Sequence, residues 1–175
     1  AAHPDDAELC CGGTIAALVN AGKKTGIIDL TRGELGTRGS VKQREIEARK
    51  ASEILGIDTR ENLGIRDGNI INNHANRLNI YYMQTYSFEP NIIFDISETF
   101  KTKMEAVKCF STQFFSGSTR SKKVAETFIS TKAFMDYIEA RSKFYGFRIG
   151  TAYGEAYFAE ENIKINSDTL FKITG

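Results

Sequence analysis

Short β-branched runs alternate with helix-length amphipathic stretches along this chain, and that alternation constrains the fold more than any other feature of the sequence. Residues 25–31 form a compact β-branched run that is typical of a buried strand. A capping-box pattern, Ser40-x-x-Gln43, then predicts a helix that runs to Leu55 and ends at Gly56. Strands that alternate with helices through short loops favour a parallel sheet covered on both faces. The sequence therefore predicts an α/β, Rossmann-like parallel-sheet sandwich with helices on both faces.

The same patterns predict further elements along the chain. Residues 12–14 lead into a short helix, residues 62–63 form a very short strand, and residues 91–94 form a strand after Pro90. Three more helices are expected: over residues 75–86, after a cap at Ser97, and from Thr131 onward. The tail, residues 150–165, has no clear period, so no element is predicted there.

The composition excludes several classes of protein. The 175 residues are enough for a single domain over 1–175, and the 23 Lys and Arg nearly balance the 22 Asp and Glu. A net charge of +1 argues against a general nucleic-acid binder, which needs a basic face. No apolar run approaches the roughly 20 residues that span a bilayer, so no membrane partner is expected. The three cysteines have no C-x-x-C spacing, which favours a reducing, cytoplasmic location over a disulfide scaffold.

The stretch His3-Pro4-Asp5-Asp6 carries the most chemical information. Ligands bind at the carboxyl ends of parallel strands, so the loops at 3–13 and 31–39 lie on the expected functional edge. A histidine and a carboxylate, with one further ligand, make a catalytic zinc site, and a neighbouring carboxylate can take a proton from water. The alternative is that Asp5 or Asp6 only caps the following helix while His3 is a surface residue. Four such residues in one loop that Pro4 stiffens favour the metal site.

These residues resemble a known family. The opening over residues 2–8, followed by 12–14, closely resembles that of the LmbE-like (PIG-L) zinc deacetylases, and the similarity continues over residues 29–37 and 44–51. Later stretches, residues 104–108, 139–141, 146–150 and 153–156, look most like the subgroup that deacetylates N-acetylglucosaminyl-malate in bacillithiol biosynthesis. The resemblance implies a Rossmann-like fold, a zinc cofactor and removal of the acetyl group from an N-acetylglucosaminyl conjugate.

The resemblance also implies roles for individual residues. His3 and Asp6 are implied as metal ligands and Asp5 as the general base. Arg44 is implied to lie near the substrate, where a guanidinium would pair with malate carboxylates; a solvated helix residue is the alternative. Glu34 and Arg38 are expected to line the same cleft, with solvation in the loop as the alternative for both.

The chain departs from the family in its histidines. The family takes its third metal ligand from a His-x-x-His segment after a later strand, and the first histidine of that segment is implied to stabilise the oxyanion. The second histidine of this chain, His74, does not match that position. The strand at 91–94 leads into a helix cap without the crossover that a parallel sheet needs. We therefore expect the family's first strand, and an internal segment between Phe94 and Asp95, to be missing from this sequence.

Two functional hypotheses follow. The first is a zinc-dependent N-deacetylase, with Fe²⁺ as the other ion that a His/carboxylate site accepts. The second is a catalytically inactive sugar-conjugate binding protein, because a third ligand is absent. Both take a small-molecule glycoconjugate as partner, and the family resemblance favours a homo-oligomer, a trimer or hexamer. Cys10 and Cys11 lie beside the metal loop, where packing is favoured over ligation, and Gly12-Gly13 lacks the pattern of a phosphate-binding loop.

Overall fold

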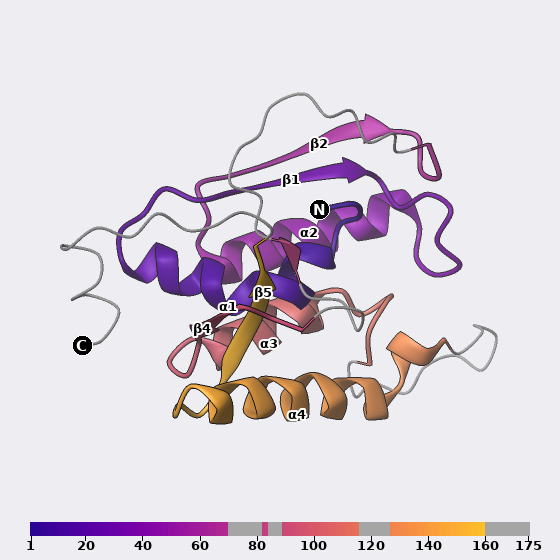
Figure 1. The fold of residues 1–175 in the computed structure, drawn as a ribbon. Helices are drawn as coiled ribbons and strands as arrows, with labels where there is room; N and C mark the ends of the chain where they lie inside the picture. The colour runs from indigo at the N-terminus through magenta and orange to yellow at the C-terminus, as the bar shows by residue number, and fades with distance from the viewer. Residues whose placement is uncertain (70–81, 84–88, 116–126, 160–175) are drawn as a thin grey trace.

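The chain forms two small sheets with helices packed between and beside them (Figure 1). The structure, a computed structural model, describes residues 1–69, 82–83, 89–115 and 127–159. Strand β1 (Gly26–Thr31) pairs in parallel with β2 (Thr59–Ile65). In the second sheet, β5 (Gly154–Phe158) lies between β3 (Tyr82–Met83) and β4 (Ile92–Asp95), antiparallel to both. The predicted α/β class with a parallel sheet is confirmed, and the antiparallel sheet is an addition to it.

Four α-helices accompany the sheets. They are α1 (Asp6–Asn20), α2 (Val41–Leu55), α3 (Phe100–Cys109) and α4 (Lys132–Arg148), and a short 3-10 turn, η1 (Phe128–Ser130), precedes α4. The capping box predicted at Ser40 and the helix predicted to start at Thr131 are confirmed. Ser40 accepts from the Gln43 backbone N–H in a complete capping box, and Thr131 accepts from the Phe134 N–H. No helix of the described residues is long and apolar enough to cross a membrane.

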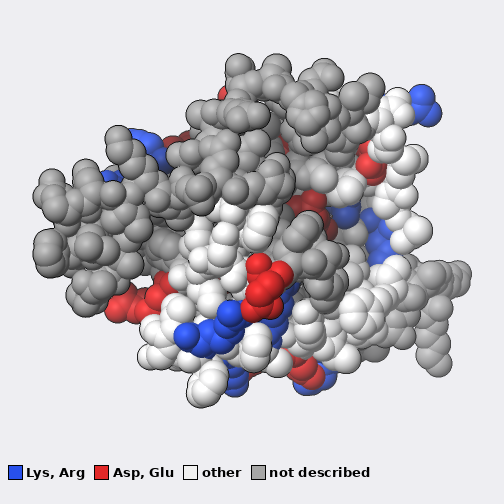
Figure 2. All heavy atoms as spheres, viewed as in Figure 1, with Lys and Arg blue, Asp and Glu red and all other residues white. Residues whose placement is uncertain are grey.

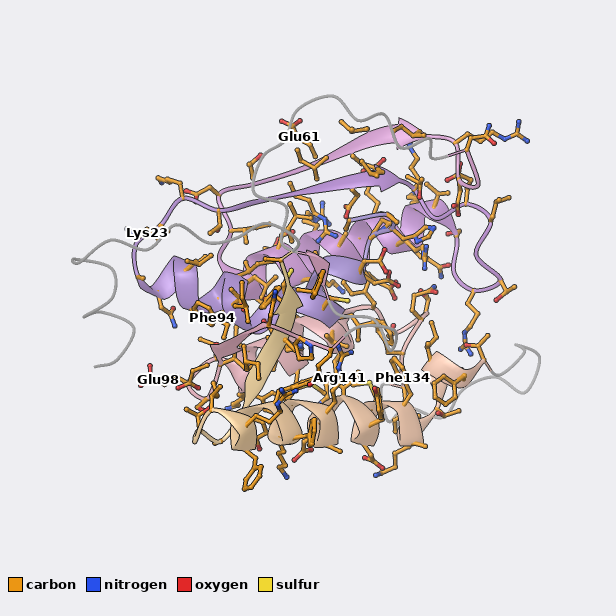
Figure 3. All side chains as sticks on the ribbon, viewed as in Figure 1. Lys23, Glu61, Phe94, Glu98, Phe134 and Arg141 are labelled. Atoms are coloured by element: carbon orange, nitrogen blue, oxygen red, sulfur yellow. The ribbon has the colours of Figure 1, made fainter. Side chains whose placement is uncertain are left out.

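Charged side chains of both signs lie next to one another on the face shown in Figure 2, as the near-zero net charge suggests. The main core lies beneath this surface, where α1, α2 and α3 meet. Phe134 of α4 is 4% exposed; it stacks on Phe114 at a ring-centroid distance of 6.0 Å and points toward this core (Figure 3). The fully buried residues at its centre are Ala51, Ala106, Val107 and Phe110. On the opposite side of the β1–β2 pair, Ile28 and Leu63 are more than half exposed.

Ala1 and Ala2 form hydrogen bonds with β1 in the pattern of a neighbouring parallel strand. The Ala1 amino group donates to the Ile28 carbonyl at 2.8 Å, while the Ala1 carbonyl accepts from Leu30 N–H at 2.8 Å. Thr31 N–H donates to the Ala2 carbonyl at 3.1 Å. The loop that starts at His3 therefore leaves the sheet at the same edge as the loop after β1, which is the functional edge expected from the sequence.

Two predictions around β4 are wrong. The strand does not end at Phe94, because Phe94 and Asp95 pair with Glu155 and Gly154 in successive positions of the ladder. The segment expected to be missing between Phe94 and Asp95 stays a prediction. Ser97 does not cap α3 either, since its hydroxyl donates to Asp95 and accepts from backbone N–H groups at 152 and 153; Thr99 occupies the N-cap position.

Three further predictions differ from the structure. The tail expected to lack any element contains β5, whose residues are nearly all buried between neighbours. Within the helix expected over 75–86, Tyr82–Met83 is a strand, and the rest of that segment lies outside the described residues. Helix α1 begins earlier than expected, at Asp6, and contains a kink at Cys11, where φ is −134°. These elements are set by pairing with distant segments rather than by local propensity.

The glycines after this kink allow other elements to pack closely. A Cβ on Gly13 would lie 2.8 Å from Cγ2 of Ile96, whereas one on Gly12 would lie 3.4 Å from Cγ of Lys103, an ordinary contact. Gly12 and Gly13 are therefore packing residues, in agreement with the low support for a phosphate-binding loop.

We predict that Gly13→Ala lowers the free energy of unfolding by about 1–3 kcal/mol, because the methyl group overpacks against Ile96. The matched control is Gly12→Ala, which we expect to be neutral or slightly stabilising because alanine favours a helix by about 1 kcal/mol over glycine. Urea denaturation of the two variants measures the difference. Equal effects at the two positions would contradict this packing account.

Candidate active site

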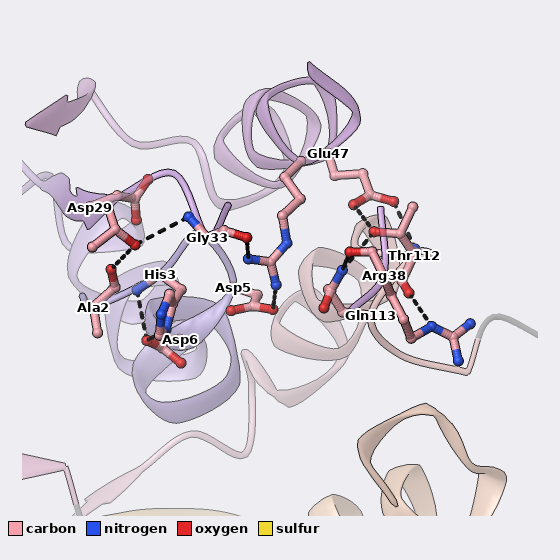
Figure 4. Close-up of polar contacts among 12 residues, drawn as sticks. Ala2, His3, Asp5, Asp6, Asp29, Gly33, Arg38, Glu47, Thr112 and Gln113 are labelled. Carbon is pink, nitrogen blue, oxygen red and sulfur yellow. Dashed lines mark hydrogen bonds and ion pairs between the residues drawn. The ribbon is translucent and has the colours of Figure 1, made fainter. Parts of the chain in front are cut away.

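The His3–Asp6 loop holds one strained and buried carboxylate. Asp5 has φ 130° and is the one residue other than glycine with a positive φ in the described part of the chain. Its side chain makes no capping bond to α1, although it stands at the N-cap position. Asp6 instead accepts from His3 N–H at 2.9 Å (Figure 4). The helix-capping alternative therefore does not describe Asp5, and backbone strain of this kind is common at functional sites.

Asp5 faces a buried arginine. Nη2 of Arg44 donates to Oδ2 of Asp5 at 3.3 Å, and Nη1 donates to the Gly33 carbonyl at 3.3 Å (Figure 4). Both side chains are less than one tenth exposed. Burial raises the pKa of Asp5 to about 7, and the Arg44 charge opposes this shift. Arg44 thus lies at the predicted site, where its terminal nitrogens bind protein groups.

The His3 side chain lies between two carboxylates. Nδ1 is 3.5 Å from Oδ2 of Asp6, and Nε2 is 3.0 Å from Oδ1 of Asp67. The bond from His3 holds the pKa of Asp67 below its usual range. Asp67 is not among the site residues predicted from the sequence; it lies in Arg66-Asp67-Gly68-Asn69, a run typical of a turn. Its position just after β2, at the same sheet edge, is the signal that could have identified it.

Glu34 also lies at this edge, as predicted. Its Oε1 accepts from the Asp67 backbone N–H at 2.8 Å, and this bond lowers the pKa of Glu34. Oδ2 of Asp67 in turn accepts from Leu35 N–H at 3.3 Å. The loop after β1 and the turn after β2 are therefore joined next to His3, with the Glu34 side chain exposed.

Arg38 does not lie in the cleft, and this prediction is wrong. The side chain is buried; Nε donates to the Thr112 carbonyl at 2.8 Å and Nη1 to Oγ of Ser130 at 2.8 Å. Nε2 of Gln113 donates to the Arg38 carbonyl at 2.7 Å (Figure 4). Arg38 thus ties the loop before α2 to the residues after α3 and to η1. Neither a position in the cleft nor solvation in the loop describes these bonds. The sequence could not reveal them, because the partners are more than 70 residues away along the chain.

The donor set fits a metal ion only in part. His3 and Asp6 approach each other as two ligands would, but the described residues contain no group of three or more His, Cys, Asp or Glu side chains arranged to hold a metal. Burial raises the pKa of Cys10 to about 11 and of Cys11 to about 12, so both are neutral thiols and packing residues. His74 lies outside the described residues. A catalytic zinc site has three protein ligands, and of the residues expected as ligands the structure brings together His3 and Asp6.

A cavity of about 550 Å³ borders this loop at Pro4 and extends between β1, β2 and α2. This volume is within the range of small-molecule sites. Its charged lining residues are Asp29, Arg32, Glu45, Arg49 and Arg60. Arg60 bonds both carboxylate oxygens of Asp29, at 2.8 and 3.0 Å, and also Glu8 of α1. The cavity therefore offers a polar surface of both signs, and Pro4 is the residue of the His3–Asp6 loop that lines it.

The sequence matches a family model and a curated relative. The model, PIG-L, described as GlcNAc-PI de-N-acetylase, matches residues 1–103. The relative, the uncharacterized deacetylase YaiS of Escherichia coli K12, is 39% identical over 75 residues. The match covers 38% of this chain and 40% of the relative, so the matched part spans well under half of that protein.

Solved structures share the fold over nearly the whole chain. The conserved protein TT1542 from Thermus thermophilus has a TM-score of 0.76 and 25% identity, with 95% of each chain covered. N,N'-diacetylchitobiose deacetylase from Pyrococcus horikoshii has a TM-score of 0.69 and 18% identity, over 95% of this chain and 85% of that one. The hydratase GalB from Pseudomonas putida has a TM-score of 0.66 and 15% identity, over 95% and 96%. The last two similarities concern the fold alone.

The family model covers more than half of the 175 residues, and its matched region contains His3, Asp5, Asp6, Glu34 and Arg44. Together with the fold shared with TT1542, this shows that the chain belongs to the PIG-L family.

Proposed function

We propose that this protein is a metal-dependent hydrolase that removes the acetyl group from an N-acetylglucosaminyl conjugate. The observation that carries the proposal is the buried Asp5 carboxylate, held against Arg44 beside His3 and Asp6 at the carboxyl edge of the parallel strands. The description of the PIG-L family and the name of the Escherichia coli relative support deacetylation as the reaction. The polar cavity at Pro4 offers room for a sugar-sized ligand beside the loop.

Asp5 is proposed as the general base. Its burial raises the affinity of the carboxylate for a proton, and the Arg44 guanidinium keeps the ionised form accessible while fixing one oxygen in place. The other oxygen remains to accept a proton from the attacking water and to return it to the amine that leaves. The bond from Arg44 to the Gly33 carbonyl fixes the guanidinium itself. We therefore assign Arg44 to the orientation of Asp5.

His3 and Asp6 are proposed to hold a divalent ion, with a third ligand from outside the described residues. Zinc is the first choice and ferrous iron the second, since both accept imidazole and carboxylate ligands. Such an ion would supply Lewis-acid polarisation of the amide carbonyl. Nδ1 of His3 faces Asp6, so the contact between Nε2 and Asp67 would be kept and would orient the imidazole toward such an ion.

The finer proposal is N-acetylglucosaminyl-malate as the substrate, in bacillithiol biosynthesis. It is supported by the similarity of residues 104–108 and 153–156 to that subgroup. In the structure both terminal nitrogens of Arg44 already bond protein groups, so the carboxylates of malate would need other cationic partners. A panel of N-acetylglucosaminyl conjugates, assayed for release of acetate, identifies the aglycone.

The second candidate function is a sugar-conjugate binding protein without catalysis. It is favoured by one observation: the described residues contain no group of three or more side chains that could hold a metal ion. Elemental analysis combined with an acetate assay separates the two functions. Metal-free protein that binds the conjugate without releasing acetate would support the second.

Asp5→Asn is predicted to keep the bound metal and to lose deacetylation by about 10²–10⁴-fold, because an amide cannot accept the proton. His3→Ala is predicted to lose both metal and activity. Metal content by elemental analysis and acetate release by a coupled assay measure the two effects. Asp58→Asn, at an exposed aspartate that pairs with Lys24, is the control and should change neither. Turnover by Asp5→Asn at the parent rate would exclude Asp5 as the base.

Arg38→Gln is predicted to lower stability without raising KM. The substitution removes the Arg38 donor from the Thr112 carbonyl, which costs about 1–3 kcal/mol, and it removes one of the two donors to Oγ of Ser130. Thermal unfolding and steady-state kinetics are the measurements, with Arg66→Gln at an exposed position as the control. A KM that rises several-fold at unchanged Tm would show instead that Arg38 contacts the substrate.

A further inference from the structure

The kink in α1 gives that helix a second N-terminus inside the protein. Cys11 has φ −134° and ψ 17°, so the regular hydrogen-bond pattern is interrupted there. Backbone N–H groups just after such a break lack partners within the helix and need acceptors from elsewhere. The segment before the break, Asp6–Cys10, is the part of α1 that directly follows Asp5 and carries the Asp6 carboxylate.

Glu155 of β5 provides these acceptors. Its Oε1 accepts from Gly13 N–H at 2.9 Å, and its Oε2 accepts from Thr14 N–H at 2.8 Å and from Oγ1 of Thr14 at 2.6 Å. A carboxylate at this place also lies at the positive end of the second helical segment, which is favourable. One side chain from a strand more than 140 residues away therefore caps the second half of α1.

Two residues of α3 and its N-cap also bind Glu155 and Gly13. Nζ of Lys103 donates to Oε1 of Glu155 at 2.6 Å, and Oγ1 of Thr99 donates to the Gly13 carbonyl at 2.7 Å. The hydroxyl of Tyr157 is 3.2 Å from Oε2 of Glu155. Both backbone groups of Gly13 are thus bound by side chains from other elements, and the kink is fixed relative to α3 and β5.

The Lys103–Glu155 pair is buried, with side chains 4% and 2% exposed. A buried ion pair is weak evidence for stability, because well-packed apolar residues of similar size often serve as well or better. Five groups within hydrogen-bond distance of one carboxylate do specify a geometry that apolar packing would not. The role that this leaves for Glu155 is to fix the direction of α1 on either side of the kink.

We propose that Glu155 is a positioning residue: by capping the second segment of α1 it sets the direction in which the first segment presents Asp5 and Asp6. The proposal rests on the proposed function, in which these two carboxylates are the base and a metal ligand. It also gives a role to the Gly154-Glu155-Ala156 stretch, which otherwise serves only as a family resemblance.

The test begins with Glu155→Gln, which keeps the shape but offers one acceptor oxygen for two backbone donors. We expect kcat to fall by about 10- to 100-fold, as a displacement near 1 Å of a catalytic group does, while KM changes less than about 2-fold. Because this variant leaves Lys103 charged and unpaired, it is compared with Glu155→Gln/Lys103→Met. The double variant should recover most of the lost Tm but not the lost kcat.

Glu47→Gln is the matched control for losing a buried glutamate. Glu47 is also less than one tenth exposed and accepts from Ser111 and twice from Thr112. These three bonds join α2 to the residues after α3 and do not involve α1. We expect Glu47→Gln to lower Tm with kcat unchanged. If Glu155→Gln behaves in the same way, or if the double variant regains kcat together with Tm, Glu155 is only structural and the proposal is wrong.

A second measurement does not depend on activity. The chain has two histidines, so the side-chain ¹H–¹⁵N spectrum can be assigned with a single substitution of His74. We expect the His3 imidazole signals to shift in Glu155→Gln and in the double variant but not in Glu47→Gln, because His3 moves with the loop. Unshifted His3 signals would overturn the positioning role. Parent protein that binds metal but never releases acetate would overturn the proposed function instead, while the histidine spectrum still decides the role of Glu155.

Discussion

A carboxylate that is removed from water needs donors, and this requirement determines how the elements of the protein are joined. In the part of the chain that the structure describes, five carboxylates are at most 7% exposed: Asp5, Glu8, Asp29, Glu47 and Glu155. Each is bonded to a group on another element, and together they connect α1, α2, α3 and both sheets. Removing one donor would leave a buried charge, which costs far more than an exposed ion pair contributes. The apolar core provides most of the driving force for folding, and these bonds specify the arrangement.

The sequence predicted those features that depend on neighbouring residues. The capping box at Ser40, the cap at Thr131 and strand β1 are local patterns, and the structure has all three. The His3–Asp6 loop could be placed at the functional edge because the order of strands and helices determines that edge. Arg38 could not be placed, because its partners are on segments far along the chain. The same holds for Asp67, which a turn pattern describes but does not connect to His3.

The fold alone does not decide the reaction. A hydratase shares it at a TM-score of 0.66, over nearly the whole of both chains. A common scaffold often supports unrelated chemistries, because function depends on the side chains at one edge. In this chain the side chains that we propose for the reaction are His3, Asp5 and Asp6, which lie in the region that the family model matches.

The backbone conformation of Asp5 lowers the stability of the protein, while its carboxylate is the proposed general base. A φ of 130° is unfavourable for any residue with a Cβ, by about 1–3 kcal/mol, and glycine would adopt it without that penalty. Selection for stability alone would therefore favour glycine at this position, at the loss of the carboxylate. A stabilised descendant of this protein would be expected to change here early, and to become a binding protein as it did so. In the proposed function, the strain at Asp5 is the cost of placing a carboxylate where glycine would be more stable.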